Sequence, residues 1–462
     1  MSQLSLPPFS RRSLLTGLGA GVTGLGLAAC GAPGGGDDDA DAPVREGYGQ
    51  ADVDIPSEYS DRTPILFWAP FTGENFEAVQ WQFQRFNESQ DDIVAVAEPQ
   101  GSYDDMRQKL TAALQAQSVP DIVALPGMQW MAYYVSNALV PLDEYFDDDW
   151  NPDIYIDPFA KEYVAAGSTY LVPFARSTPI FYYNKDLYRQ AGLPEEGPTT
   201  WNDLADFGPE LAKIDVGGQS LATVVFGGGD ASWQAQGEIW GFGGAYSKDF
   251  EVTINDERGV ECFEFQRKFI HDDGFGYLAQ EPTTDFTTGP AAGVRASTAS
   301  LTGITSEASF EVGCAFLPGQ INAPTQVPTG GSGLAIVRSD SKERQDACAE
   351  LFRFLAQPEV AAEWHRDTGY LPIVEASHDT EIVRELVAEN PNYGVALDQL
   401  EYAQVPDRAG WVEENTSEVG QQLLAIYGDN VEVQSTLDNL AETLQDNLDE
   451  SREDIEKLLG SE

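Results

Sequence analysis

Residues 63–126 read TPILFWAPFTGENFEAVQWQFQRFNESQDDIVAVAEPQGSYDDMRQKLTAALQAQSVPDIVALP, a stretch in which two hydrophobic periods alternate. Short apolar runs at 65–68, 93–97 and 121–125 have the length and composition of buried strands. The segments between these runs are longer and have the period of a helix. Their apolar residues lie on one helix face, namely Phe76, Val79, Phe83 and Phe86 in the first segment and Met106, Leu110 and Ala113 in the second.

This order of strand, helix, strand, helix and strand predicts crossover units and a sheet of parallel type. Open sheets of this kind bind ligands beyond the carboxyl ends of their strands. Gly73, residues 101–103 and residues 126–127 lie at or just past those ends. The sequence therefore predicts an α/β fold with a ligand site at this edge of the sheet.

The chain beyond this stretch predicts further α/β structure. Residues 171–183 are extended, residues 201–212 form a helix with Thr200 as its N-cap, and residues 330–333 form a tight turn into a strand. Two helices follow at about 342–356 and 358–367. The last predicted helix has Ser435 as its cap and a leucine stripe at Leu437, Leu440, Leu444 and Leu448.

The length of 462 residues suits two or three domains, and a hydrophobic content of 42% allows a packed core. Lys and Arg total 26 against 76 Asp and Glu, which gives a formal net charge of −50. This charge excludes a nucleic-acid partner, because phosphates would be repelled. The acids are spread along the chain and there are only 8 Lys. We therefore expect a carboxylate-covered surface in a high-salt habitat, the alternative being an acidic protein from ordinary salt.

The N-terminus has the features of an export signal. Arg11 and Arg12 precede an uncharged stretch at 14–29, which is too short to span a bilayer comfortably. The pair resembles a twin-arginine signal, and Leu-Ala-Ala-Cys-Gly at 27–31 resembles a lipobox with Cys30 as the lipidated residue. Residues 1–30 are thus expected to be removed or lipidated and 31–62 to form a flexible tether, which places the mature chain outside the cell on a lipid anchor. A short buried helix behind chance arginines is the alternative.

Catalytic and metal motifs are missing from the sequence. The three His, at 271, 365 and 378, form no His-Glu-x-x-His, and there is no Gly-x-Ser-x-Gly. Cys262, Cys314 and Cys348 match no zinc spacing and are expected to be buried free thiols. We expect no cofactor, no metal and no enzymatic activity. A secreted hydrolase of glycosides or phosphodiesters is the alternative, which turnover would reveal.

Three segments resemble a known family. They are Pro173-Phe-Ala-Arg-Ser-Thr-Pro-Ile-Phe-Tyr-Tyr-Asn-Lys-Asp-Leu187, Gly330-Gly-Ser-Gly-Leu334, and Phe354-Leu-Ala-Gln-Pro-Glu359 with Thr368-Gly-Tyr-Leu-Pro372. Their order and separations resemble the extracellular solute-binding proteins of ABC importers for sugars and glycerol phosphate, the glycerol-phosphate-binding members most of all. The resemblance covers roughly residues 63–450.

The resemblance implies a type II periplasmic-binding-protein fold, in which two α/β lobes are joined by hinge crossings and close on a ligand. It implies that residues 63–174 and 330–372 form lobe one and residues 175–329 and 373–462 form lobe two. The expected protein is a monomer that captures a small polar solute and delivers it to ABC permease subunits in the membrane.

Position by position, the resemblance implies cleft roles for five residues: Tyr103, Ser177, Ser297, Gly331 and Tyr370. The Tyr and Ser hydroxyls can donate hydrogen bonds to a polyol and accept them from it. Gly331 lets a backbone amide approach a hydroxyl or an anion closely. Aromatic faces suit the apolar faces of sugars, which makes Trp201, Trp233 and Trp240 stacking candidates. The alternative for each is a core role, for Trp201 as a packing residue at a helix start.

Two departures from the family bear on the ligand. The glycerol-phosphate members carry a Glu where this chain has Gly127, and their phosphate-contacting Arg has no match around 415–425. Arg176 could supply a positive charge instead, and Arg408 lies near the missing position. The expected ligand class is therefore a polyol-type solute, namely glycerol-3-phosphate, a glycerophosphodiester, or a mono- or disaccharide.

Overall fold

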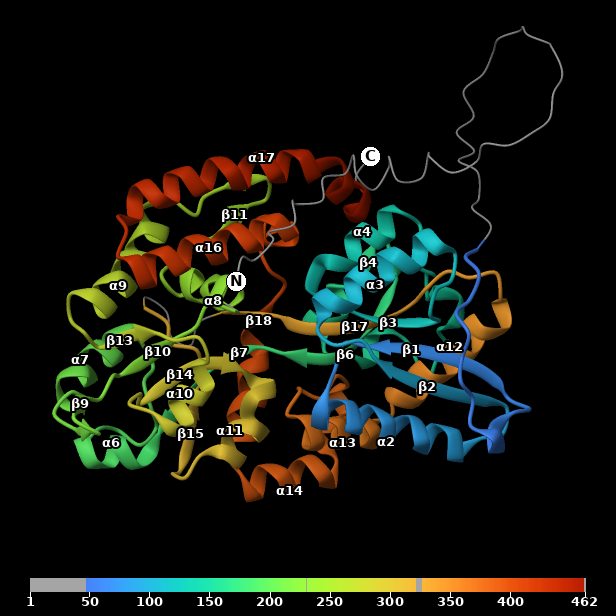
Figure 1. Ribbon diagram of the computed structural model, residues 1–462, viewed down its shortest axis with the longest axis horizontal. Coiled ribbons are helices and arrows are strands. Elements are labelled where there is room, and N and C mark those ends of the chain that lie inside the picture. Colours follow the sequence, from blue (N-terminus) through green and yellow to red (C-terminus); the bar gives the residue numbers. More distant parts are fainter. Residues whose placement is uncertain (1–46, 230, 321–325, 461–462) are drawn as a thin grey trace, which may run out of the picture.

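Two five-stranded sheets organise the chain in the computed structural model, which describes residues 47–229, 231–320 and 326–460 (Figure 1). Each sheet has helices on both faces, so the molecule consists of two α/β lobes. The expected export signal and Cys30 lie outside the described residues.

The lobe-one sheet has the strand order β2-β1-β3-β17-β6. Its strands are β1 (Thr63–Ala69), β2 (Ile93–Pro99), β3 (Ile122–Pro126), β6 (Leu171–Ser177) and β17 (Gly330–Ile336). The first three are parallel, as the alternating periods predicted, whereas β17 runs antiparallel to β3 and to β6. The carboxyl ends of β1 and β3 therefore meet the start of β17 at one edge.

Helices cover both faces of this sheet. The helices of lobe one are α2 (Gly73–Ser89), α3 (Tyr103–Ala116), α4 (Trp130–Val135), α5 (Asp157–Lys161), α12 (Lys342–Leu355) and α13 (Pro358–Thr368). Val79, Phe83 and Phe86 of α2 pack with α12 and α13 on one face, and Met106 and Leu110 of α3 pack with α4 on the other. Ser102 and Asp105 form a capping box that fixes where α3 begins.

The lobe-two sheet has the order β13-β10-β14-β7-β15. Its strands are β7 (Pro179–Asn184), β10 (Val224–Phe226), β13 (Gly276–Leu278), β14 (Gly293–Ser297) and β15 (Val312–Ala315). Its helices are α6 (Lys185–Ala191), α7 (Trp201–Leu211), α8 (Ala231–Gly241), α9 (Glu257–His271), α10 (Pro282–Thr288), α11 (Leu301–Glu307), α15 (Asn392–Asp398), α16 (Glu413–Asp429) and α17 (Val433–Leu459). Helix α14 (Glu381–Glu389) contacts both α13 of lobe one and α15. Thr200 caps α7 through a capping box, as predicted.

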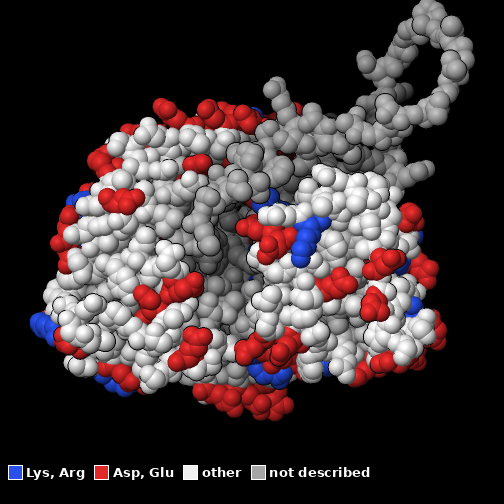
Figure 2. Space-filling view, viewed as in Figure 1, with Lys and Arg blue, Asp and Glu red and all other residues white. Residues whose placement is uncertain are grey.

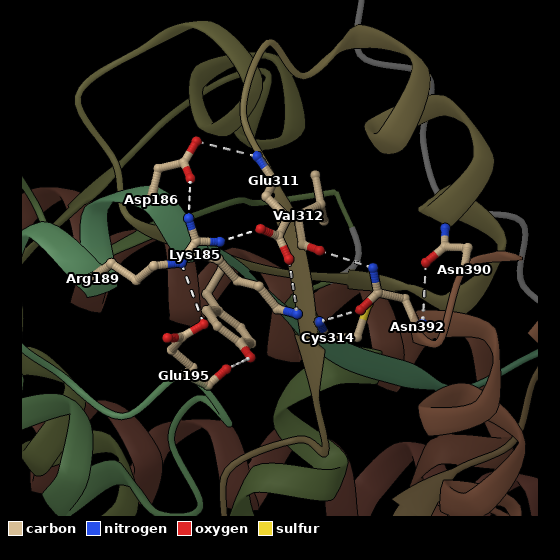
Figure 3. A network of polar contacts seen from close by, with 10 residues as sticks. Lys185, Asp186, Arg189, Glu195, Glu311, Val312, Cys314, Asn390 and Asn392 are labelled. Atoms are coloured by element: carbon tan, nitrogen blue, oxygen red, sulfur yellow. Dashed lines mark hydrogen bonds and ion pairs between the residues drawn. The ribbon is translucent and has the colours of Figure 1, made fainter. Parts of the chain in front are cut away.

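Side-chain bonds cover the outer edge of β15 (Figure 3). The amide of Asn392 donates to the Val312 carbonyl at 2.9 Å and accepts from the Cys314 N–H at 2.9 Å. Beside them, Glu311 pairs with Lys185 at 3.3 Å and with Arg189. These contacts attach α15 to lobe two and satisfy a strand edge that would otherwise be open.

Three segments cross between the lobes. The first is Thr178, between β6 of lobe one and β7 of lobe two, so the lobe-one sheet extends to Ser177, beyond the expected boundary at 174. The second is Thr329, which follows β16 (Val327–Pro328) and precedes β17. The third begins near Leu371, whose N–H donates to the Arg176 carbonyl at 2.7 Å.

The C-terminal helix α17 contacts both lobes, across the top of the view in Figure 1. Its leucine stripe packs into the core of lobe two, but Leu458 packs with Trp130 and Tyr133 of lobe one. Near that end, the Ala166 N–H donates to the Leu458 carbonyl at 2.7 Å. The expected cap Ser435 is wrong: the Glu432 carboxylate accepts from the first N–H groups of the helix, and Ser435 lies in its first turn.

Two other expectations need correction. Residues 47–62 are not all tether, because Tyr48 is buried in lobe one and the Ala51 N–H donates to the Val119 carbonyl at 2.9 Å. Residues 330–333 form no tight turn. They belong to strand β17, whose small side chains allow β6 to approach closely. Within the described ranges, no helix is both long enough and apolar enough to cross a membrane.

Candidate functional site

Three of the residues implied by the family resemblance meet at the strand-end edge of lobe one. The Tyr103 hydroxyl donates to Ser332 Oγ at 3.0 Å, and Ser332 is a neighbour of Gly331 on β17. The Tyr370 ring stacks on Trp364 with centroids 5.9 Å apart, and Phe71 contacts both tyrosine rings. Burial raises the pKa of Tyr103, so its hydroxyl stays protonated and can donate a hydrogen bond. We call Tyr103, Ser332 and Tyr370 the hydroxyl cluster.

Gly331 and Ser177 lie where the chain crosses between lobes. Gly331 has φ +79° and pairs with Arg176, and a Cβ at this position would overlap the Ala175 carbonyl oxygen. Ser177 pairs with Gly330 and is almost completely buried. Both therefore lie beside the hydroxyl cluster, and the close approach of two backbones explains why a glycine is needed there.

Ser297 borders the same crossing from lobe two. It ends β14 opposite Pro179, and its Oγ accepts from the Ala299 N–H at 3.2 Å. The next residue, Thr298, donates its N–H to the Thr178 carbonyl at 2.9 Å. The structure thus brings the five implied cleft residues into the neighbourhood of the lobe crossings, from both lobes.

The three tryptophans have different environments. Trp233 of α8 is half-buried, its Nε1 donates to the Thr329 carbonyl at 3.0 Å, and its ring lies over Gly330 at the second crossing. Trp240 donates to Asp407 at 3.2 Å on the lobe-two side. Trp201 is fully buried against Phe226 and Phe269, so it packs the lobe-two core and offers no face to a ligand. Trp233 remains the best-placed stacking candidate.

Arg176 does not present an unpaired charge, contrary to the expectation from sequence. Its guanidinium is fully buried, forms a salt bridge with Glu162, donates to the Tyr163 hydroxyl and lies over the Phe159 ring. The carboxylate neutralises the guanidinium inside the protein, since a buried charge needs a partner. Arg408, the second candidate, pairs with Asp249 at 3.2 Å. Both arginines therefore already have a carboxylate partner in the protein.

His365 supports the hydroxyl cluster from behind. Its Nδ1 lies 2.7 Å from the Tyr370 carbonyl oxygen, and its ring meets Tyr393 edge-on. Burial lowers the pKa of His365 to about 4, so the neutral ring donates to this carbonyl at ordinary pH. Its position ties helix α13 to the third crossing.

A hollow of about 330 Å³ lies between the lobes. It is bordered by Thr72 and Asn75 at the start of α2, by Ser300 and Thr302 of lobe two, and by Thr368. Figure 2 shows that the molecular surface is hollowed between the two lobes, with carboxylates spread over the surrounding face. Polar residues from both lobes therefore border the inter-lobe space, and they include the acidic residues Glu74, Glu307 and Asp367.

Some features of the site could not be found from motifs. Trp364 and Phe71, which hold Tyr370 and Tyr103, look like ordinary core residues in the sequence, and Glu162 has no motif at all. Cys262, Cys314 and Cys348 are free and buried, as predicted. The described parts of the chain contain no group of His, Cys, Asp and Glu side chains arranged to hold a metal ion.

Two α/β lobes, three crossing segments and a polar space between the lobes define a solute-binding protein of the two-lobed class. The comparison with protein families agrees: the model of the bacterial extracellular solute-binding proteins matches residues 81–393, more than half of the chain, and the chain belongs to this family. It is an extracellular or periplasmic substrate-binding protein of the kind that serves ABC importers, and its relatives are solute-binding proteins, not enzymes.

Two relatives and one solved structure are similar to this chain over most of its length. The sn-glycerol-3-phosphate-binding periplasmic protein UgpB of Salmonella typhimurium is 30% identical over 361 residues, which are 73% of this chain and 80% of that protein. UgpB of Yersinia pseudotuberculosis is 29% identical over 405 residues, with 82% and 90% covered. The crystal structure of UgpB from Mycobacterium tuberculosis in complex with glycerophosphocholine superposes with a TM-score of 0.79 at 34% identity, covering 84% of this chain and 99% of that one.

Maltose-type binding proteins share the fold alone. The cyclic α-maltosyl-1,6-maltose binding protein from Arthrobacter globiformis has a TM-score of 0.73 at 21% identity, with 84% of this chain and 100% of that chain covered. The two-lobed fold predicted from the sequence is confirmed by these neighbours and by the sheet topology.

Proposed function

We propose that this chain captures a small polyol-type solute between its lobes and delivers it, as a monomer, to the permease subunits of an ABC importer. The observation that carries the proposal is the similarity, at 34% identity over nearly the whole of the other chain, to a UgpB whose structure holds glycerophosphocholine. The hydroxyl cluster supplies donors and acceptors for a polyol, and the Tyr370 and Trp233 rings suit the apolar face of a ligand.

Charge favours a ligand with no net negative charge. The chain carries a formal −50, Glu162 neutralises Arg176, and Asp249 pairs with Arg408. A phosphomonoester dianion would lack an unpaired cation at these positions. A zwitterionic glycerophosphodiester or a neutral sugar avoids that repulsion, and we rank both above glycerol-3-phosphate.

Ligand binding shifts the population of lobe arrangements. Contacts come from lobe one at Tyr103 and Tyr370 and from lobe two at Ser297 and Trp233, so only a closed arrangement makes all of them. The free energy of those combined contacts favours closure. A closed, solute-loaded form would then be the form that the permease subunits recognise.

Calorimetric titration of residues 47–462 in multimolar KCl tests the ligand class. Glycerophosphocholine, glycerol-3-phosphate and a panel of mono- and disaccharides are added separately. A bound ligand at 100 times its dissociation constant should raise the unfolding free energy by about 2.7 kcal/mol, which a melting shift reports. Heat from glycerophosphocholine or a sugar supports the proposal, whereas no heat from any of the panel would refute it. Release of choline or free sugar during the titration would indicate a hydrolase instead.

We further propose twin-arginine export, lipidation at Cys30 and adaptation to high salt. The support is the sequence: the Arg11-Arg12 pair, the lipobox at 27–31 and the excess of carboxylates. Cys30→Ser should release the protein from the membrane fraction into the medium, and Arg11→Lys with Arg12→Lys should keep it inside the cell. Screening of the carboxylates predicts a higher melting temperature in 3 M than in 0.1 M KCl.

A further inference from the structure

Glu162 has one carboxylate oxygen that the protein leaves without a hydrogen-bond partner. The residue follows α5 and its side chain is fully buried. Oε2 accepts from the Arg176 guanidinium, and the backbone carbonyl accepts from Trp130 Nε1 at 3.1 Å. Oε1 has no partner among the described residues. A buried acceptor without a donor is unusual, because the free energy of its lost hydration is not offset by a hydrogen bond within the protein.

The free oxygen lies near Gly127, the residue that follows β3. A Cβ built on Gly127 would lie 3.9 Å from Glu162 Oε1, and no other described atom outside the neighbouring residues lies within 4 Å of it. Gly127 begins the short helix η2 (Gly127–Gln129), which packs against η8 (Arg408–Trp411) from lobe two. The space over Gly127 is thus at the strand-end edge where sheets of this type bind ligands, with lobe two close by.

Glu162 also belongs to the same neighbourhood as the hydroxyl cluster. Its partner Arg176 pairs in the sheet with Gly331, and the charge of Arg176 acts on the Tyr103 hydroxyl. The carboxylate is therefore connected to Tyr103 and Ser332 through one buried arginine. Glu162 and Tyr103 are thus both neighbours of the same buried arginine.

We infer that Glu162 is a specificity-determining residue, whose Oε1 accepts a hydrogen bond from a hydroxyl of the polyol part of the solute in the space over Gly127. This inference rests on the proposed function and identifies the ligand group that the site recognises. A carboxylate repels a phosphate group, and a quaternary ammonium has no hydrogen to donate. A hydroxyl is the group that satisfies the buried oxygen.

The competing explanation is that Glu162 serves only as the counter-ion of Arg176. Lobe two contains a matched pair that distinguishes the two explanations. Glu238 and Arg295 form a buried salt bridge in the lobe-two core, and there both carboxylate oxygens have protein partners, since Glu238 Oε2 accepts from Gln266 at 2.8 Å. Glu238→Gln should therefore reproduce the loss of a buried charge pair without touching a ligand.

The test compares Glu162→Gln with Glu238→Gln by melting temperature and by affinity. The probe is glycerophosphocholine, with propyl phosphocholine as the analogue that lacks both glycerol hydroxyls, or a sugar and its deoxy forms if the unaltered protein binds only sugar. Both substitutions should lower the melting temperature. Only Glu162→Gln should weaken binding of the hydroxylated probe, by about 10-fold or more, and reduce the preference for it over the analogue.

Gly127→Ala provides a second arm that keeps the charge pair intact. The added methyl group occupies the space beside Oε1, so affinity should fall by about 10-fold or more. Gly192→Ala, at φ +72° with no atom within 4 Å of a Cβ, is its control for backbone strain. Unchanged affinity in both Glu162→Gln and Gly127→Ala, with normal binding by the unaltered protein, would overturn this inference alone. If the unaltered protein bound no probe, the proposed function would fail and this inference with it.

Discussion

Gly331→Ala should damage both stability and binding, because this residue lies where two backbones cross between lobes. Gly331 has φ +79°, a conformation that costs an alanine about 1–2 kcal/mol. A Cβ there would also overlap the Ala175 carbonyl oxygen and lie 3.1 Å from Arg176 Cα, so β6 and β17 must separate. Separation strains the pairing of Gly331 with Arg176, and overpacking of this kind costs about 1–3 kcal/mol.

The expected loss is therefore about 2–5 kcal/mol of unfolding free energy. At roughly 2–4 °C per kcal/mol for lobes of this size, the melting temperature should fall by about 4–20 °C. Differential scanning fluorimetry in multimolar KCl measures the shift, and calorimetric titration with glycerophosphocholine measures affinity. We expect the affinity to fall as well, because the same backbone shift moves Ser332 away from Tyr103.

Gly420→Ala is the matched control. Gly420 lies inside α16, and no atom lies within 4 Å of a Cβ built there. The same substitution should raise stability by about 0.5–1 kcal/mol and leave affinity unchanged. A Gly331→Ala protein that melts within about 2 °C of the unaltered protein, with unchanged affinity, would show that the crossing tolerates a side chain and that the reasoning is wrong.

Three further predictions concern the site and its support. Because the folded pKa of His365 is about 4, against 6.5 in the unfolded chain, its stabilisation is complete above pH 6.5 and is lost as pH falls toward 4. His365→Gln should flatten the pH dependence of the unfolding free energy in that window by about 3 kcal/mol, and equal slopes in both proteins would contradict this. Tyr370→Phe should keep the stack on Trp364 but remove a hydroxyl that hydrogen-bonds Tyr103, so ligand binding should weaken about 5- to 10-fold and the unfolding free energy should fall by about 0.5–1.5 kcal/mol, as titration and melting would show. Trp201→Ala should cost about 3–5 kcal/mol through a core cavity, whereas Trp233→Ala should mainly reduce affinity, and the reverse ranking would show that Trp201 is the ligand platform.

Much of the fold could be predicted because it depends on local periodicity. The alternation of 3.6-residue and strand periods over 63–126 predicted three parallel strands and two helices, and all five are present. The antiparallel insertion of β17 could not be predicted from residues 330–337 alone, because Gly330 and Gly331 read as a turn. Their role as strand residues depends on β6, which lies more than 150 positions earlier in the chain.

Only part of the site could be predicted from the sequence. Tyr103 and Gly331 were implied by position, and the structure explains them by a hydroxyl bond and a close backbone approach. Arg176 was misjudged because its partner Glu162 is one of 76 acids, and nothing in the sequence distinguishes it. Trp201 was ambiguous for a similar reason, since burial depends on Phe226 and Phe269 from distant segments.

The position of α17 provides a way to observe lobe rotation in solution. This helix of about 40 Å is anchored in lobe two by its leucine stripe, while its last turn accepts the Ala166 N–H of lobe one. A rotation of the lobes must either turn about this contact or break it, and the last carbonyls of a helix have no internal partner to compensate. The hydrogen–deuterium exchange rate of the Ala166 amide therefore reports how often the helix end separates from lobe one. Its value can be compared in the absence and presence of solute.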